Sequence, residues 1–258
     1  HFFLYIKFHK QLPKLNKNLT GLMYHIRSSD ILSDPLRITV TDKEYAKKFI
    51  SDKIGNSHVV PTIKVLHSVK SNFFNNLPSQ YVIKATHSSG LVFLKRNNTD
   101  LIDLDKIKNW LDENYYKVTR EKNYKDLIPK LIIEEYIFPN HSNVDYKFWC
   151  WNGEVKLIQV DIDRFAHHRR SFFDVSLKIM KIDTGFLEAD INLKQINNIY
   201  KMKNAANKLA SHFSGYIRID MYSNGDHFYI GELTNHADGA AKKYNKNDDE
   251  YLYNILTN

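Results

Sequence analysis

Cysteine, glycine and proline are all scarce in this chain of 258 residues, and long apolar runs are missing. The single cysteine, Cys150, excludes a disulfide framework and a multi-thiolate metal site, and it predicts a reducing compartment, the cytoplasm. No apolar stretch approaches the ~20 residues of a membrane-spanning helix, so we expect no membrane span. With nine glycines and six prolines, the chain has no flexible linker and is expected to consist mostly of regular elements.

Two nucleotide-binding signatures are absent as well. The sequence contains neither the GxGxxG pattern of dinucleotide-binding folds nor the GxxxxGKS/T phosphate loop. Both absences argue against a Rossmann or P-loop enzyme.

Positive charge is in excess, because 37 lysines and arginines stand against 29 acidic residues, a formal net charge of +8. Such an excess is typical of nucleic-acid-binding proteins and of enzymes whose substrates are phosphorylated or carboxylated. A solvated, merely solubilising surface has the same composition. Charge alone does not choose among these three interpretations.

Hydrophobic periodicity and turn residues predict an α+β fold. Helices are expected after Thr41 or Asp42 as far as Ile54, after Asp103, over 195–212 and around Leu252. Runs of β-branched and aromatic residues predict strands over 81–85, 91–95, 131–137, 146–151, 155–161, 215–222 and 227–233. The pairs Asn152-Gly153 and Asn224-Gly225 predict two hairpins, hence mixed, largely antiparallel sheets. Residues 1–35 show no clear pattern.

A loop of small residues, Thr86–Gly90, separates two of the predicted strands. Lys84 precedes it and Lys95 lies on the following strand. Small residues let backbone N–H groups approach an anion closely, and the hydroxyls of Ser88 and Ser89 add donors. The segment is either a phosphate-binding loop or a simple hairpin with two solvated lysines.

A second polar cluster lies on the predicted hairpin around Asn224-Gly225. Arg218, Asp220 and Glu232 share one face of the sheet if the loop holds an odd number of residues, as in a three-residue loop with Gly225 in the left-handed conformation. Two carboxylates on one face can hold Mg²⁺, with the arginine left for an anionic substrate. The alternative is a solvated salt bridge.

The densest cationic stretch is Arg164–Arg170, which we interpret as a loop. It is either a solvated basic loop or a site for an acidic substrate held by guanidinium groups. We name Arg164, His167, His168, Arg169 and Lys243 as substrate-binding candidates, and Arg170 also as a catalytic one. Cys150, between Trp149 and Trp151, is expected to be a packed thiol rather than a nucleophile.

These segments, in this order, resemble the ATP-grasp enzymes, and specifically the TupA-like branch named for teichuronopeptide biosynthesis. The resemblance covers roughly residues 33–245. The matching pieces are Thr41-Asp42-Lys43, Val82-Ile83-Lys84, Glu134-Glu135-Tyr136-Ile137, Asp145-Tyr146-Lys147-Phe148, Asp161–Phe165, Arg169–Asp174, Arg218-Ile219-Asp220 and Gly231-Glu232-Leu233-Thr234.

The resemblance implies roles for these residues. Lys43 and Lys84 would reach the nucleotide phosphates under a lid formed by Thr86–Gly90, with Ser88, Ser89, Gly90 and Lys95 nearby. Glu134, Glu135, Tyr136 and Ile137 would form the adenine-binding hinge. Asp220 and Glu232 would bind Mg²⁺, with Asn235 named as a third ligand although the family usually places that Asn at position 234. Arg218 would stabilise the acyl-phosphate, and Lys147 is a further catalytic candidate.

The resemblance also implies an activity and an organisation. Such enzymes use ATP and Mg²⁺ to phosphorylate a small-molecule carboxylate, and an amine then displaces the phosphate. The TupA-like branch points to a hexuronic acid, free or nucleotide-linked, or to an acidic amino acid, in capsule or other surface polysaccharide biosynthesis. We expect residues 1–75 to precede the ATP-grasp fold, 76–137 to form its lid and 138–258 its metal and acceptor subdomain. Because the first residue is not Met, we also expect a larger multidomain protein.

Two other function classes stay open on the sequence. A kinase would use the same ATP site but end at phosphoryl transfer to a sugar or amino compound. A basic nucleic-acid-binding module would need no ATP, but acidic residues at 220 and 232 make it the weaker hypothesis, and we expect no nucleic acid partner.

Overall fold

The computed structural model describes residues 2–10, 12–139, 144–163, 167–237 and 242–258. Its helices are α1 Phe2–His9, α2 Leu19–Ser28, α3 Pro35–Thr41, α4 Lys43–Ile54, α5 Leu104–Asn109, α6 Tyr115–Thr119, α7 Ile199–Ala210 and α8 Lys246–Thr257. Its strands are β1 Thr62–Leu66, β2 Tyr81–Ala85, β3 Val92–Lys95, β4 Leu131–Glu135, β5 Val144–Trp151, β6 Glu154–Ile162, β7 Arg169–Asp174, β8 Ile179–Met180, β9 Tyr216–Ser223 and β10 Phe228–Thr234. No helix among the described residues is long and apolar enough to cross a membrane.

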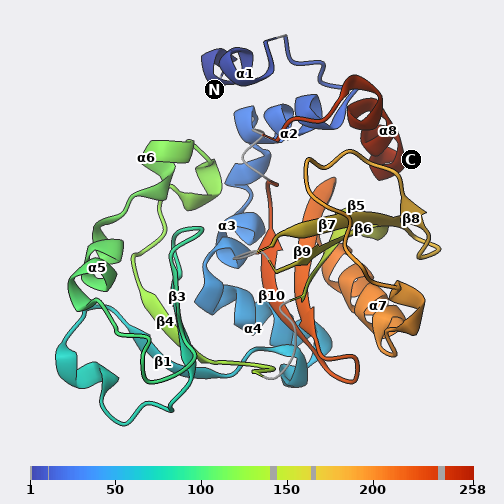
Figure 1. Ribbon diagram of the computed structural model, residues 1–258. Coiled ribbons are helices and arrows are strands. Elements are labelled where there is room, and N and C mark those ends of the chain that lie inside the picture. The colour runs from blue at the N-terminus through green and yellow to red at the C-terminus, as the bar shows by residue number, and fades with distance from the viewer. Residues whose placement is uncertain (1, 11, 140–143, 164–166, 238–241) are drawn as a thin grey trace.

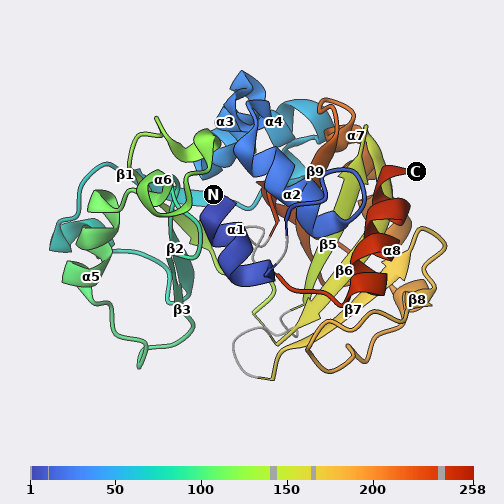
Figure 2. The ribbon, with the colours of Figure 1, turned by 90° about the horizontal axis from the view of Figure 1, so that it is seen from above.

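The strands form two antiparallel sheets. A small sheet has the order β1-β4-β2-β3, and a large one has the order β10-β9-β5-β6-β7-β8. Figure 1 shows the small sheet with α5 and α6 on one side of the molecule, the large sheet with α7 and α8 on the other, and α3 and α4 between them. The view from above again separates the two sheets, with α8 at the outer side of the large one (Figure 2). The expected α+β class is confirmed.

The large sheet is packed on both faces. Residues such as Phe148, Ile219 and Val160 point from one face toward α7 and α4. On the opposite face, Trp149 and Phe172 pack with apolar residues of α2 and α8. This second face becomes polar toward one end, where it carries Lys147, Asp161 and Arg170 in place of aromatic side chains.

The small sheet has one packed face and one open face. Tyr81, Ile83 and Ile133 pack against Ile107 of α5 and the neighbouring Trp110. The alternate residues, among them Val82 and Lys84 of β2, face a cavity. Because β1 pairs with β4, this sheet begins before residue 76, the boundary predicted from the sequence.

Local sequence signals account for several of these elements. The Asp42 carboxylate accepts hydrogen bonds from the backbone N–H groups of Glu44 and Tyr45 and so caps α4, which ends at Gly55 with φ 97°. Asn152 and Gly153 both have positive φ, as a tight hairpin between β5 and β6 requires. The other predicted helices and strands are present, and Cys150 is fully buried, as expected of a packed thiol.

Other elements were not predicted. Two helices, α1 and α2, lie within the segment 1–35, and the basic stretch that we interpreted as a loop contributes Arg169 and Arg170 to strand β7. The pleat of β7 exposes Arg169 and buries Arg170. A strand whose inward residue is charged has no apolar alternation, which is why the sequence pattern was misleading.

The hairpin between β9 and β10 places Arg218, Asp220 and Glu232 on one face, as predicted, but not through an odd-numbered loop. Four residues, 224–227, separate the first pair, Ser223 and Phe228, so the loop is even rather than odd. A β-bulge at Gly231 then shifts the register by one residue and brings Glu232 opposite Asp220. A Cβ at position 231 would lie 2.6 Å from the ring of Tyr222, which explains the glycine.

Candidate active site between the two sheets

A cavity of about 590 Å³ lies between the two sheets. The small sheet and its loop contribute Lys84, Ser89 and Glu134 to its wall, and the large sheet contributes Asp220 and Glu232. The wall therefore combines residues that are far apart in the sequence, and the sequence analysis had named all five.

Lys43 and the Thr86–Gly90 loop form one end of this cavity. Lys43 is the first residue of α4, and its Nζ donates a hydrogen bond to the Ser88 carbonyl oxygen at 2.5 Å. Ser89 and Gly90 line the cavity, whereas Ser88 is buried outside the lining and contributes its backbone. Burial lowers the pKa of Lys43, so its ammonium is poorly solvated and is suited to an anionic ligand.

Glu134 is the centre of a buried ion-pair triad. Its Oε1 lies 2.5 Å from Lys47 Nζ, and its Oε2 lies 2.7 Å from Lys84 Nζ. Burial opposes the charged form of Glu134, but the two lysines hold the pKa of its carboxyl below the ordinary value. Burial likewise opposes the charge of Lys84, yet Glu134 raises the pKa of that lysine. Glu134 and Lys84, which both line the cavity, therefore stay charged.

The segment after Glu134 continues along the cavity. Glu135, Tyr136 and Ile137 all line it, as does Phe138. Strand β4 ends at Glu135, so the backbone N–H and C=O groups of the following residues are not used in sheet pairing and can bind a ligand in the cavity. This is the segment in which the sequence analysis placed the adenine-binding hinge.

The opposite wall carries the paired carboxylates. Asp220 and Glu232 are cross-strand neighbours, as are Arg218 and Thr234. Arg218 makes a two-pronged ion pair with Asp220, with Nε–Oδ1 at 2.6 Å and Nη2–Oδ2 at 2.7 Å. Among the described residues no group of three or more His, Cys, Asp or Glu side chains suits a metal ion. Two adjacent carboxylates nevertheless suit Mg²⁺, which proteins usually hold by one or two carboxylates together with substrate phosphates.

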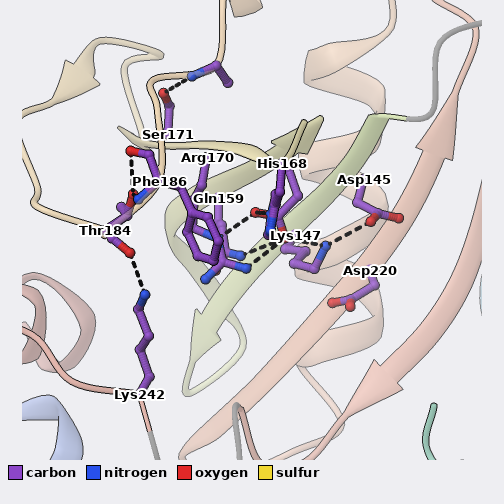
Figure 3. Close-up of polar contacts among 12 residues, drawn as sticks. Asp145, Lys147, Gln159, His168, Arg170, Ser171, Thr184, Phe186, Asp220 and Lys242 are labelled. Atoms are coloured by element: carbon purple, nitrogen blue, oxygen red, sulfur yellow. Dashed lines mark hydrogen bonds and ion pairs between the residues drawn. The ribbon is translucent and has the colours of Figure 1, made fainter. Parts of the chain in front are cut away.

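A row of alternating charges extends from this wall across the large sheet. Lys147 is paired in register with Asp220, and its Nζ lies 2.9 Å from Asp161 and 3.3 Å from Asp145 (Figure 3). Asp161, fully buried, also receives Arg170 Nε at 2.5 Å and Nη2 at 3.1 Å. Burial opposes its charge, but Lys147 and Arg170 hold the pKa of Asp161 far below the ordinary value.

The row ends at an exposed aromatic ring. Phe186 is 41% exposed, and three cationic or titratable side chains contact its ring: His168 with centroids 4.1 Å apart, Arg170 at 5.0 Å and Lys242 at 4.7 Å. Figure 3 shows these residues on one side of the sheet, with Lys242 donating to the Thr184 carbonyl oxygen. Neither Lys147 nor Arg170 lines the cavity itself; Asp145 and Asp220 connect them to it.

Two predicted site residues lie elsewhere and need correction. Lys95 points to the opposite face of the small sheet from Lys84, and its Nζ donates to the carbonyl oxygen of Asp100 at 2.5 Å. Asn235 also points away from the cavity. Its side chain accepts a hydrogen bond from Arg37 at 3.0 Å and donates one to Thr41 at 3.1 Å. The strand pleat places Thr234, not Asn235, beside the carboxylates.

The remaining substrate candidates are spread over the surface near Phe186. His167, Arg169 and Lys243 are exposed, and His168 is half-buried with its Nε2 3.2 Å from Asp161. Arg164 lies outside the described residues.

Sequence reasoning missed several cavity residues. Tyr115, Glu121, Tyr124 and His236 line the end near Ser89. His236 continues the parity of Glu232 and Thr234, which is a signal that could have identified it. The segment 115–124 offered none, because it is a polar stretch with two short helical turns.

Two sheets that enclose a polar cavity, with lysines on one wall and paired carboxylates on the other, define the ATP-grasp class of fold. A family model described as TupA-like ATPgrasp matches residues 19–257. This match covers nearly the whole chain, which therefore belongs to the TupA-like ATP-grasp family. No curated protein matches the chain.

Solved structures give only distant similarities. The D-alanine-D-alanine ligase of Helicobacter pylori is 14% identical over 85% of this chain and 58% of its own, with a TM-score of 0.47. The Bacillus anthracis enzyme is 17% identical over 99% of this chain and 84% of its own, with a TM-score of 0.45. The ATP-grasp ligase PsnB, complexed with a minimal precursor, is 10% identical over 88% and 62%, with a TM-score of 0.46. The chain spans less than two thirds of the Helicobacter and PsnB structures.

Proposed function

We propose that this chain is an ATP-dependent carboxylate–amine ligase that forms an amide through an acyl-phosphate and releases ADP. The observation that carries the proposal is the meeting of Lys43 and Lys84 with Arg218, Asp220 and Glu232 around one cavity. A carboxylate is a poor electrophile, so phosphorylation supplies the leaving group, and charge neutralisation and positioning do most of the catalysis.

In this proposal the nucleotide lies along the cavity. The adenine contacts the segment Glu134–Ile137, and the phosphates extend toward Lys43, Lys84 and the 86–90 loop. Asp220 and Glu232 hold Mg²⁺, which when bound neutralises phosphate charge during transfer. Arg218 stabilises the acyl-phosphate. To do so, its guanidinium group either breaks its ion pair with Asp220 or binds Asp220 and the acyl-phosphate together.

We propose further that the acid is a hexuronic acid, free or nucleotide-linked, that serves surface polysaccharide biosynthesis in the cytoplasm. The support is the charged row that leads from Asp220 to Arg170 and the exposed ring of Phe186. Guanidinium groups bind carboxylates and phosphates, and an aromatic ring stacks on the apolar face of a sugar. In Arg170→Ala we expect KM for the acid to rise at least ~10-fold, the loss of a single charge-assisted hydrogen bond, with KM for ATP unchanged. An unchanged KM for the acid would remove Arg170 from the acid site.

The direct test is binding followed by turnover. Millimolar Mg-ADP should raise the melting temperature of the chain, since a ligand that binds only the folded state stabilises it. ATP with glucuronic acid or UDP-glucuronic acid should then yield a hydroxamate in the presence of hydroxylamine, which traps acyl-phosphates. The absence of any Mg-ADP shift would refute the nucleotide site. ADP release that yields a stable phosphorylated product and needs no amine would favour a kinase.

A nucleic-acid-binding module is the least supported alternative. Carboxylates of Glu134, Asp145, Asp220 and Glu232 line the same cavity as the cations, and they would repel a phosphate backbone. Salt-sensitive binding to oligonucleotides, with no change in melting temperature on addition of Mg-ADP, would favour this alternative.

A further inference from the structure

His236 and Glu121 form a buried pair at the end of the cavity near Ser89 and Gly90. His236 follows β10 and is 6% exposed, and Glu121 precedes the short turn Lys122–Tyr124 and is 5% exposed. His236 Nδ1 lies 3.6 Å from Glu121 Oε1, which is beyond hydrogen-bond length. The two side chains therefore face each other across the cavity wall, His236 from the end of β10 and Glu121 from the segment before β4, without a hydrogen bond between them.

Neither ring nitrogen of His236 has a hydrogen-bond partner among the described residues. An unpaired buried polar group is costly, because it has lost its hydrogen bonds to water without gaining others. Both nitrogens of one buried histidine are unpaired here, which is rare in a folded protein and calls for an explanation. A ligand that donates to one nitrogen while Glu121 accepts from the other would satisfy both.

The pair lines the same cavity as the predicted reaction centre. The rings of Tyr115 and Tyr124 are in tilted contact, with centroids 4.5 Å apart, and line the same cavity as Glu121. Burial, followed by the charges of Glu121 and Glu232, raises the pKa of Tyr115 to about 12. Burial and the same two carboxylates raise the pKa of Tyr124. The two neutral phenols thus line the same cavity as Glu121 and Glu232, the proposed metal ligand.

We propose that His236 and Glu121 form the subsite for the amine substrate, with His236 as the general base. The inference rests on the proposed ligase activity and adds the site and class of its second substrate, a small primary amine that arrives as an ammonium ion. Glu121 attracts the ammonium, and Tyr115 and Tyr124 line the same cavity. The charged groups that line the same cavity are the carboxylates Glu121, Glu134, Glu135, Asp145, Asp220 and Glu232 and the cations Lys43, Lys84 and Arg218.

The chemistry balances with the ligase reaction. The ammonium gives one proton to a ring nitrogen of His236, and Glu121 stabilises the imidazolium that forms. The amine lone pair then attacks the acyl carbon, a C–N bond forms, and the C–O bond to phosphate breaks with its electron pair on the departing phosphate. The second proton of the nitrogen leaves with that phosphate.

The experiment compares two nucleophiles that attack the same acyl-phosphate. Hydroxylamine is uncharged at neutral pH and needs no base, whereas ethanolamine is an ammonium ion. In His236→Gln, with ATP and glucuronic or UDP-glucuronic acid, we expect hydroxamate formation within ~3-fold of wild type. We expect amide formation with ethanolamine to fall by at least ~100-fold at pH 7, because general bases contribute about 10²–10⁴-fold. The residual amide rate of the variant should rise with pH as ethanolamine loses its proton, unlike that of wild type.

Glu121→Gln supplies the second test, with an expected rise in KM for ethanolamine and no change in KM for the acid. His67→Gln and Glu113→Gln are matched controls on exposed residues. Equal losses with both nucleophiles, or an unchanged ethanolamine rate, would overturn the amine subsite. No hydroxamate from the wild-type chain would instead overturn the ligase proposal itself. If His236→Gln fails to fold, the KM split of Glu121→Gln decides.

Discussion

The β-bulge at Gly231 offers a strict test of how this chain assembles its carboxylate pair. In Gly231→Ala, the new methyl group would lie 2.6 Å from Tyr222 Cε2 and 3.1 Å from its Cζ. Tyr222 is half-buried and lines the cavity, so a ring displaced by the methyl group would disturb the cavity wall. Overpacking of this kind costs about 1–3 kcal/mol. For a chain of this length that corresponds to a fall in melting temperature of about 2–10 °C.

A loss of ligand response should accompany the loss of stability. If the strand escapes the collision by losing its bulge, Glu232 turns to the other face of the sheet, because a shift of one residue reverses every side chain. Mg-ADP would then raise the melting temperature by much less than in wild type. Urea unfolding with and without Mg-ADP measures both effects.

A double-mutant cycle isolates the contact. On a Tyr222→Ala background the methyl group has room, so Gly231→Ala should cost less there, with a coupling energy of about 1–2 kcal/mol. Gly225→Ala serves as control, because a Cβ at 225 has no neighbour within 4 Å and would strain only the positive-φ backbone. If Gly231→Ala matched wild type in both stability and Mg-ADP response, the bulge would not be what positions Glu232.

Three further predictions concern buried groups. Asp161→Asn should lower the free energy of unfolding by about 3–5 kcal/mol in urea titrations, because it leaves the buried cations Lys147 and Arg170 without their shared carboxylate; a change below ~1 kcal/mol would contradict the network. Folding lowers the pKa of Glu134, so its ion pairs stabilise the fold at pH values above the ordinary pKa of about 4.3, and this contribution disappears as the pH falls through the lower pKa of the folded state. Glu134→Gln should remove this part of the pH dependence of the free energy of unfolding. If the free energy of unfolding of the variant fell at acid pH as it does in wild type, the prediction would be wrong. Burial raises the pKa of Cys150, so a thiol reagent should modify it only at the rate of global unfolding; rapid modification of the native chain would show an open path to it.

The elements that the sequence predicted well carry their signals locally. The Asp42 cap, the Asn152-Gly153 turn and the apolar stripe of α7 each involve residues within one or two turns of chain. Position within a sheet also follows from parity once the strands are known. Parity placed Arg218 and Asp220 on one face of β9, and the same rule, applied to β3 and β10, would have excluded Lys95 and Asn235.

What could not be predicted depends on contacts between distant segments. The bulge at Gly231 is dictated by the ring of Tyr222, nine residues earlier, and not by any turn signal. The burial of Arg170 depends on Asp161 in the neighbouring strand, so its sequence context is that of a solvated loop. Likewise, Glu121 and His236 are 115 positions apart and meet only because the segment before β4 lies against the end of β10.

The cavity also changes how the net charge of the chain should be interpreted. Although lysines and arginines outnumber acidic residues overall, the described cavity lining has more carboxylates than cations. The carboxylates are Glu121, Glu134, Glu135, Asp145, Asp220 and Glu232, and the cations are Lys43, Lys84 and Arg218. A bare triphosphate entering this space would meet more negative charge than positive, at distances too short for salt to screen. We therefore expect the phosphates to enter only together with divalent cations, which Asp220 and Glu232 would bind from the protein side. The selection of an anion by this site would then depend on those cations and not on the excess of lysine elsewhere on the chain.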